Sequence, residues 1–262
     1  FEAWLREKKG PQMSYLERRK HERMDPKKYF PRLQSILCFG LEHFPGWAQG
    51  KYKISNYAWG EDYHQVLRQK LEETVEALQK VLGDFEYKVM VDTAPALEKV
   101  IAAQAGLGWQ GKNTLLLHRH AGSQFFLGEI FTDLPLSRFQ ADLPVRDHCG
   151  TCQRCIEACP TNALSPYELD AGKCISYWTL EHKGPFTNET PPWKEWIAGC
   201  DICQEVCPWN QKLIPTSTAL EPQNVEMLID LGRLDELVAG RAISYLPPES
   251  WKRNLEHVRK IR

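Results

Sequence analysis

The stretch of sequence that decides the fold is a dense run of cysteines, Cys149-Gly-Thr-Cys152-Gln-Arg-Cys155-Ile-Glu-Ala-Cys159-Pro160. After an isolated cysteine at position 174, a second run reads Cys200-Asp-Ile-Cys203-Gln-Glu-Val-Cys207-Pro208. Eight of the nine cysteines therefore lie between positions 149 and 207. Thiols gathered this densely indicate a shared local chemistry, whereas Cys38, inside a short apolar run, is expected to be a packed thiol.

Three kinds of thiol chemistry compete for these cysteines, and their spacing separates them. Disulfides need an oxidising compartment, and two-residue spacings repeated this tightly would strain such bridges. Zinc sites use pairs of ligands separated by a longer finger loop. A [4Fe–4S] cluster takes three thiolates from one tight loop and a fourth from elsewhere. Eight thiolates complete two such clusters with none left over, so the sequence predicts two [4Fe–4S] clusters.

The x2-x2-x3-Cys-Pro spacing also predicts which thiol serves which cluster. It is the form found in bacterial ferredoxins, in which the fourth cysteine of each run ligates the other cluster. One cluster is therefore expected on Cys149, Cys152, Cys155 and Cys207. The other is expected on Cys159, Cys174, Cys200 and Cys203.

The segment 175–199 separates two ligands of the second predicted cluster by far more residues than a small ferredoxin would use. It contains several aromatic and polar residues, namely Ser176, Trp178, Glu181, His182, Trp193 and Trp196. Two interpretations remain open for this insertion: a packing lid over the cluster, or part of a substrate or cofactor pocket.

Towards the N-terminus, residues 33–133 alternate between strand and helix patterns, which predicts an α/β layer. Strands are expected at 33–40, 85–91, 113–118 and 124–132, with a loop at 45–60. A helix from Asp62 to the stop at Gly83 carries an apolar stripe at three- and four-residue steps. A second helix is expected to start at Asp92 or Thr93 as its cap, with Pro95 in its first turn.

The pattern divides the chain into three segments. Residues 1–140 are expected to form a catalytic α/β domain with a solvated helix or arm over 1–32. Residues 141–215 are expected to form a ferredoxin-like two-cluster domain, which follows a linker at 134–148. Residues 216–262 are expected to be helical, interrupted by Pro247 and Pro248.

Charge and hydropathy restrict the partners of the chain. Its 262 residues include 33 Lys and Arg against 34 Asp and Glu, so gross basicity does not indicate nucleic acid, although a local basic face still could bind it. No apolar run approaches the roughly 18 residues of a membrane helix, and no signal peptide is visible. We expect a cytoplasmic monomer without a membrane segment.

Two clusters indicate one-electron steps, and a pure electron carrier needs far fewer residues, so the α/β part is expected to hold the site where the electrons are used. The string Gly106-Leu-Gly-Trp-Gln-Gly111 follows a helix rather than a strand, which is the wrong context for a dinucleotide site. Asp62-Tyr-His64 matches the start of a motif that gives cobalamin a histidine ligand, without its glycine. His64 is therefore either a cobalt ligand or part of a helix start capped by Asp62.

Six strings together resemble the epoxyqueuosine reductase family over residues 14–213. They are Tyr57-Ala-Trp-Gly-Glu-Asp-Tyr-His64, Val91-Asp-Thr-Ala-Pro-Ala-Leu-Glu-Lys99, Gly106-Leu-Gly-Trp-Gln-Gly-Lys-Asn-Thr114, Gly122-Ser-Gln-Phe-Phe-Leu-Gly-Glu129, Cys174-Ile-Ser-Tyr-Trp-Thr-Leu-Glu181 and Cys200-Asp-Ile-Cys-Gln-Glu-Val-Cys-Pro-Trp-Asn210. The resemblance implies a cobalamin-dependent oxidoreductase with two [4Fe–4S] clusters, related to reductive dehalogenases. Its substrate would be epoxyqueuosine in the anticodon stem-loop of tRNA, its product queuosine, and its reductant an external electron donor. Lys99 departs from the family, which often has Arg there.

The resemblance also implies roles for individual residues. Asp92 would be the catalytic acid that protonates the epoxide oxygen, whereas the pattern alone favours a helix N-cap. The residues expected around the corrin are Arg18, Tyr57, Asp92, Lys112, Asn113, Ser123 and Ser176. Two other functions are kept as alternatives: another corrinoid reductase of the dehalogenase kind, and a two-cluster electron-transfer subunit without a substrate of its own.

Overall fold

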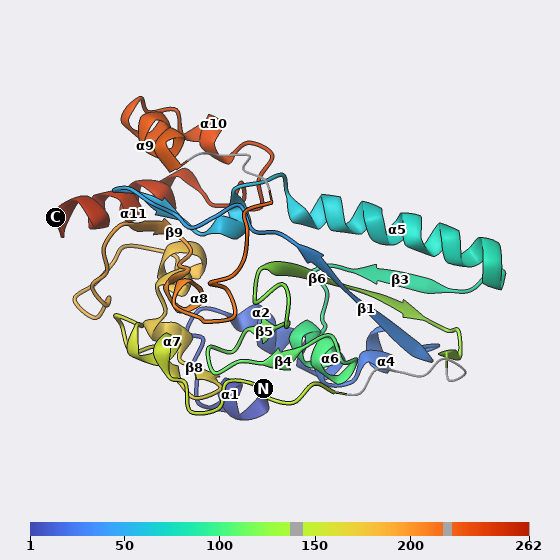
Figure 1. Cartoon of the computed structure of the whole chain (residues 1–262). Helices are drawn as coiled ribbons and strands as arrows, with labels where there is room; N and C mark the ends of the chain where they lie inside the picture. Colours follow the sequence, from blue (N-terminus) through green and yellow to red (C-terminus); the bar gives the residue numbers. More distant parts are fainter. Residues whose placement is uncertain (137–143, 217–221, 262) are drawn as a thin grey trace.

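The computed structural model describes residues 1–136, 144–216 and 222–261 (Figure 1). Its central sheet has three strands in the order β1 (Ser35–Glu42), β6 (Phe125–Thr132) and β3 (Tyr87–Met90). The middle strand, β6, is antiparallel to both neighbours, so β1 and β3 run in the same direction. The helix α5 (Tyr63–Leu82) connects these two strands, which makes a β-α-β unit split by an antiparallel strand.

Helix α5 forms where its apolar stripe predicts it and covers one face of the sheet. Leu67, Leu71 and Val75 are buried against the sheet residue Ile130. At Gly128 a Cβ atom would lie 2.7 Å from Cδ1 of Leu71, so the glycine permits the close approach of helix and sheet. The helix ends at Gly83, whose φ of 81° belongs to the left-handed region that glycine adopts without strain. The predicted helix is confirmed.

The opposite face of the sheet is covered by α6 (Glu98–Gln104) and by the N-terminal arm, where Phe30 and Ile101 pack against Phe131. The predicted start of this helix at Asp92 or Thr93 is wrong. The helix begins six residues later with no side-chain cap, and Asp92 has a φ of 51°. The segment between β3 and α6 is therefore an exposed bend rather than a helical first turn.

Two predicted elements are shorter or more structured than expected. The strand expected at 113–118 is reduced to β5 (Leu116–Leu117), which pairs with β4 (Trp109–Gln110) in a small hairpin. The loop expected at 45–60 contains β2 (Lys53–Ile54), which pairs in parallel with β9 (Trp196–Ala198) of the insertion. Long-range pairing of this kind leaves no pattern in either two- or three-residue segment, so only the tertiary structure discloses it.

The cysteine region is built from short elements around its two runs. Each run continues into a one-turn helix, α7 (Arg154–Glu157) in the first and α8 (Ile202–Glu205) in the second. Between them lie the hairpin of β7 (Leu164–Ser165) and β8 (Glu168–Leu169), a 3-10 turn at Ala171–Lys173 and a π-helical turn at Tyr177–Glu181. The predicted linker at 134–148 lies partly outside the described residues.

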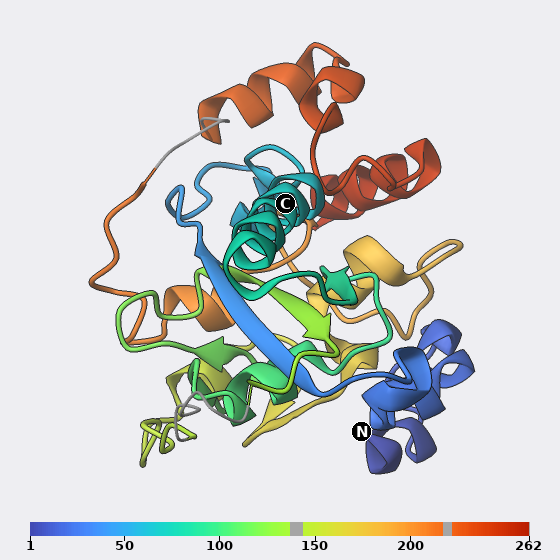
Figure 2. The ribbon, with the colours of Figure 1, turned by 90° about the vertical axis from the view of Figure 1, so that its right-hand side faces the viewer.

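The two ends of the chain are helical. The N-terminal arm contains α1 (Glu2–Arg6), α2 (Ser14–Arg18), α3 (Lys20–Met24) and α4 (Pro26–Tyr29). The C-terminal segment contains α9 (Pro222–Asp230), α10 (Leu234–Val238) and α11 (Pro248–Lys260), of which α9 and α10 lie at the opposite end of the molecule from the N-terminal arm (Figure 2). Proline interrupts the helices as predicted, and Pro248 also occupies the first turn of α11.

The largest hydrophobic core cluster crosses the predicted segment boundaries. It joins Trp59 before α5, Trp193 and Trp196 of the insertion, and Trp251 of α11. The tryptophans of segment 175–199 therefore have a packing role. The division into 1–140, 141–215 and 216–262 stays a prediction about the chain, and the packing of the described residues does not follow it.

Candidate active site

Four cysteines from both runs surround one cavity of about 270 Å³, namely Cys149, Cys152, Cys155 and Cys207. Lys112 closes one side of it, with Nζ donating to the carbonyl oxygens of Gly150 at 2.6 Å and Cys152 at 3.0 Å. Trp209 contributes an aromatic wall and packs edge-on against Trp109, with 4.9 Å between the ring centroids. The first cavity is thus a compact, partly apolar space ringed by sulfur.

The other four cysteines surround a second cavity of the same volume, about 270 Å³, namely Cys159, Cys174, Cys200 and Cys203. Cys207 therefore lies with the first run and Cys159 with the second, which is the exchanged grouping that the spacing predicts. All eight thiols are free of disulfide bonds. Four thiolates around a compact space are the donor set of a [4Fe–4S] cluster, so the residues present fit one cluster in each cavity. Their ligation itself stays a prediction.

Asn113 connects the two cysteine cavities, since it lines both. Its side chain is 4% exposed, and its Nδ2 donates to the carbonyl oxygen of Cys203 at 3.4 Å. Lys112 and Asn113 thus hold the backbone of the cysteine loops. Contact of either residue with a corrin stays a prediction.

A much larger cavity, about 720 Å³, opens at the end of β3. Its walls come from the arm, the bend before α6, the insertion and the C-terminal segment, including Tyr15, Arg23, His64, Asp92, Glu98, Lys99, Glu181 and Tyr245. Glu181 belongs to the insertion, so segment 175–199 contributes to this pocket as well as to the core. Lys99 lines both this cavity and the second cysteine cavity, so the two spaces adjoin.

Asp92 presents its carboxyl group at this large cavity. Its side chain is 58% exposed, and Oδ2 lies 3.2 Å from Nε2 of His64. Its backbone N–H donates to Oε1 of Glu98 at 2.6 Å, which holds the left-handed backbone conformation in place. An aspartate in this conformation is uncommon outside turns, and such strain concentrates at functional sites. The alternative role of Asp92 as a helix cap is wrong.

His64 is held between two carboxyl groups. Nδ1 lies 2.6 Å from Oδ1 of Asp62, whose side chain also accepts from the backbone N–H of His64 and caps α5. The hydrogen bond to Asp92 and the neighbouring Asp62 raise the pKa of His64 above its usual value. The helix-start interpretation is confirmed, and both ring nitrogens have protein partners in this structure.

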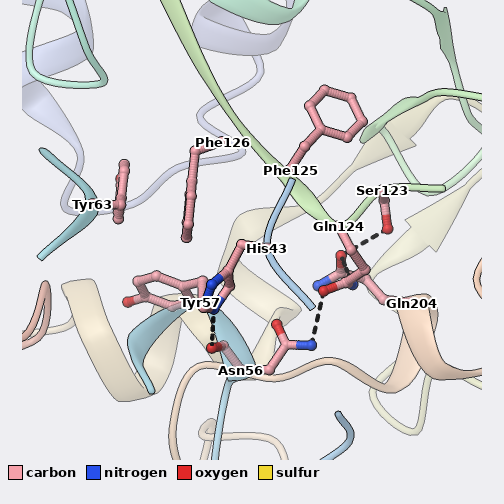
Figure 3. Close-up of a pocket in the computed structure, with 9 residues that line it drawn as sticks. All are labelled: His43, Asn56, Tyr57, Tyr63, Ser123, Gln124, Phe125, Phe126 and Gln204. Carbon is pink, nitrogen blue, oxygen red and sulfur yellow. Dashed lines mark hydrogen bonds between the residues drawn. The ribbon is translucent and has the colours of Figure 1, made fainter. Parts of the chain in front are cut away.

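A small cavity of about 150 Å³ lies beside the second cysteine cavity, with which it shares Tyr57 and Gln204 (Figure 3). Amide side chains form a chain along its floor: Nδ2 of Asn56 donates to Gln124 at 2.8 Å, and Nε2 of Gln124 donates to Gln204 at 2.9 Å. Ser123 also donates to Gln204, at 2.8 Å. The site therefore offers a polar, amide-rich surface next to a sulfur-lined one.

An aromatic wall closes the small cavity opposite these amides. The rings of Tyr63 and Phe126 stack in parallel with 4.2 Å between centroids, and His43 contacts Phe126 at 4.9 Å (Figure 3). Of this lining, sequence reasoning selected only Tyr57 and Ser123. Gln124 and Gln204 stand within two of the strings quoted above, which was the available signal, whereas nothing in the sequence singles out His43 or Asn56.

The predicted corrin-binding residues do not converge on one cavity. Asp92 lines the large cavity, Tyr57 and Ser123 line the small one, and Ser176 lines the second cysteine cavity. Arg18 is absent from the lining of these four cavities, whereas Arg23 of α3 belongs to the large one. Cys38 is a half-buried thiol in β1, as expected for a packing residue.

Comparison with known proteins identifies two family models in the chain. Residues 23–93 match the model described as Epoxyqueuosine reductase QueG, and residues 148–210 match the 4Fe-4S double cluster binding domain. An epoxyqueuosine reductase of Leadbetterella byssophila is 41% identical over 100% of this chain and 89% of the relative. One of Pseudomonas aeruginosa is 43% identical over 82% of this chain and 62% of the relative.

Solved structures give the same result. The epoxyqueuosine reductase of Streptococcus thermophilus superposes with a TM-score of 0.79 at 30% identity, over 98% of this chain and 74% of that one. An epoxyqueuosine reductase with an epoxyqueuosine-modified tRNA stem-loop has a TM-score of 0.75 at 28% identity, over 90% of this chain and 67% of that one. The predicted mixed α and β fold with a two-cluster domain is thereby confirmed. This chain belongs to the epoxyqueuosine reductase family.

Proposed function

We propose that this chain reduces epoxyqueuosine in the anticodon stem-loop of tRNA to queuosine, using a corrinoid and two [4Fe–4S] clusters. The observation that supports this most directly is the adjacency of its cavities. The second cysteine cavity shares Lys99 with the large cavity and Tyr57 with the small one. An electron on a cluster bound by the cysteines of the second cavity would therefore lie next to the space where a substrate can enter.

The electrons would follow the order of the cavities. The first cysteine cavity adjoins the second through Asn113, and the second adjoins the large cavity through Lys99. We infer that an external donor reduces the cluster of the first cavity and that single electrons pass inward from it. The clusters are suited to this relay because each accepts one electron at a time.

The large cavity is the place proposed for the reacting face of the corrinoid. Its volume of about 720 Å³ lies within the roughly 300–1,000 Å³ of cofactor and ligand pockets. Tyr15, His64 and Asp92 would bind it from this side, and Tyr57 and Ser123 from the small cavity. When bound, the corrinoid would supply a strongly reducing cobalt centre at the substrate. The protein supplies orientation, exclusion of water and protons.

Asp92 is proposed as the acid that protonates the epoxide oxygen. Reduction of an epoxide to an alkene and water consumes two electrons and two protons, and the oxygen needs a proton as its carbon bond breaks. The carboxyl group of Asp92 faces the cavity, on a bend that precedes the first turn of α6. A related structure from Bacillus subtilis, 27% identical with a TM-score of 0.76 over 92% of this chain and 68% of that one, has its aspartate catalytic loop swung out of the active site.

The proposal extends to the partners of the protein. The substrate would be the epoxyqueuosine-bearing anticodon stem-loop, the enzyme a monomer and its compartment the cytoplasm. In the part of the chain that the structure describes, no helix has both the length and the apolar character of a membrane span.

The test is anaerobic turnover by the reconstituted protein loaded with cobalamin. A synthetic anticodon stem-loop bearing epoxyqueuosine is the substrate, and the same stem-loop bearing queuosine is the control. We expect the mass of the first to fall by one oxygen atom and the second to stay unchanged. Tight cobalamin binding without reduction of the stem-loop would indicate another corrinoid reductase. A protein that holds both clusters but no cobalamin would indicate an electron-transfer subunit.

A further inference from the structure

A carboxyl group lies buried in the middle of the central sheet with no partner to neutralise it. Glu129 of β6 is 0% exposed, and neither of its carboxyl oxygens accepts a hydrogen bond from any described residue. Its neighbours across the sheet are Cys38 on β1 and Met90 on β3. A buried, unpaired carboxylate is unfavourable by several kcal/mol, so such a group is retained in its neutral, protonated form.

A second carboxyl group lies on the helix that packs against β6. Glu98 is the first residue of α6 and lines the large cavity, and the carboxyl groups of Glu98 and Glu129 raise or lower each other's pKa. Two carboxyl groups form a hydrogen bond only when one of them carries a proton. Burial and the neighbouring Glu98 raise the pKa of Glu129, and burial together with Asp92 raises the pKa of Glu98. Because Glu129 is fully buried and neither of its carboxyl oxygens has a donor among the described residues, a proton is held at this pair of carboxyl groups.

Other charged groups around the pair do not remove that proton. Lys99, beside Glu98 in the sequence, partly offsets the raised pKa of Glu98. Cys38 stays a neutral thiol, because burial and the nearby Glu129 raise its pKa to about 12. His64 is engaged by Asp62 and Asp92 rather than by the pair.

The pair is connected to the proposed catalytic acid. Oε1 of Glu98 accepts the backbone N–H of Asp92 at 2.6 Å, and both side chains line the large cavity. From the interior of the sheet to the cavity, the order of carboxyl groups is Glu129, Glu98 and Asp92. A proton held at the inner end can therefore reach the cavity through Glu98.

We propose that Glu98 and Glu129 hold one proton between them and release it through Glu98 into the active site, as the second of the two protons that the reaction consumes. This inference rests on the proposed function. In the balanced reaction both carbon–oxygen bonds of the epoxide break, two electrons arrive through the clusters, and the oxygen leaves as water. Asp92 donates the first proton to this oxygen and the carboxyl pair donates the second. Solvent protonates Asp92 and the pair again after product release.

The first measurement detects the stored proton without any turnover. Infrared spectra of the protein with both clusters, recorded at neutral pH, should contain the carbonyl stretch of a protonated carboxylic acid that Glu129→Gln abolishes. Glu98→Gln should abolish or shift the same band. The matched control is Glu76→Gln on the exposed face of α5, which should leave the band unchanged. Absence of the band in the unsubstituted protein overturns the proposal.

The second measurement is single-turnover reduction of the stem-loop with cobalt reduced in advance. Glu129→Gln should slow it about 10²-fold, at the lower end of the range of general acid catalysis. The loss should deepen as pH rises, because solvent then replaces the stored proton less readily. Glu98→Gln keeps an oxygen that accepts from Asp92 and should give the same pH profile. Unfolding temperature and cluster spectra report whether either variant is misfolded.

The outcomes separate this proposal from the proposed function. If the unsubstituted protein does not reduce the stem-loop, the proposed function fails, and the infrared band alone still establishes the stored proton. If the unsubstituted protein is active and both glutamine variants turn over at its rate across the pH range, the proton does not come from the pair. That result would overturn the inference and leave the proposed function intact.

Discussion

At the scale of single residues, Asp92 combines three properties that a capping aspartate lacks. Its backbone is in the left-handed region, its carboxyl group faces a cavity, and its partner is the imidazole of His64 rather than a helix N–H. A position with these features costs conformational free energy, of order 1–3 kcal/mol for a strained backbone. Such a cost is typical of a residue kept for chemistry.

Asp92→Asn should therefore impair turnover without unfolding the protein. The amide keeps the size of the side chain and tolerates the left-handed backbone, but it has no proton to transfer. We expect the single-turnover rate to fall about 10²–10⁴-fold, with both clusters and cobalamin still bound. The check is rapid-quench kinetics with cobalt reduced in advance. A rate close to that of the unsubstituted protein would assign the acid role to another residue or to water.

Cys207 gives a second prediction at this scale, because it lies with the first cysteine run although it follows Cys203 in the chain. Cys207→Ser should damage the cluster of the first cavity and leave the second more intact. Electron paramagnetic resonance of the reduced protein should then retain the signal of one cluster. The matched variant Cys203→Ser should remove the other signal. Loss of the same signal in both variants would contradict the exchanged assignment.

At the scale of elements, helix α11 anchors the insertion that borders the second cysteine cavity. Its Asn254, 0% exposed, donates to the carbonyl oxygens of Thr179 at 2.9 Å and Ile197 at 2.8 Å. The guanidinium of Arg253 donates to three further carbonyls, those of Trp178, His182 and Gly184. Side chains of a C-terminal helix thus donate hydrogen bonds to the backbone carbonyl oxygens at the end of the π-helical turn. These carbonyls have no N–H partner within the turn itself.

Asn254→Ala should consequently destabilise the protein, since it leaves two buried carbonyl groups without a donor. Each buried group without its partner costs about 1–3 kcal/mol, which predicts a total loss of about 2–6 kcal/mol. Denaturant unfolding of the protein with both clusters measures it. Lys252→Ala, on the exposed side of the same helix, is the control and should change stability by less than about 0.5 kcal/mol. Equal effects of the two substitutions would show that α11 does not anchor the insertion.

At the scale of the whole molecule, the two cysteine cavities and the large cavity adjoin one another in a row. The net charge of −1 gives no indication of this arrangement. In the proposed reaction, electrons would reach the large cavity from the cluster bound in the second cysteine cavity. Protons would reach it from Glu129 of β6 through Glu98 of α6. The N-terminal arm, the bend before α6, the insertion and the C-terminal segment each contribute to its walls.

Binding of the tRNA stem-loop should depend on salt despite the low net charge. A local basic surface would contact a few phosphates, and each contact contributes about 0.7–0.9 to the slope of log affinity against log salt concentration. We expect a slope of a few units, measured by fluorescence anisotropy of a labelled stem-loop between low and physiological salt. The unlabelled stem-loop serves as competitor. Affinity that does not change with salt would exclude phosphate contacts as a main source of binding.

The sequence alone was sufficient to predict which four cysteines line each cavity, because the spacing of thiols within a tight loop restricts the clusters that they can hold. Helix α5 was equally predictable, since the periodicity of its apolar residues reports which of its faces is buried. Periodicity does not report which element covers that face. The antiparallel insertion of β6 between β1 and β3, the pairing of β2 with β9 and the late start of α6 therefore required the tertiary structure. The same reason explains Glu129: as a residue in a strand it looks ordinary, and only the packing of α6 over β6 buries it against Glu98 and leaves its carboxyl group without a donor.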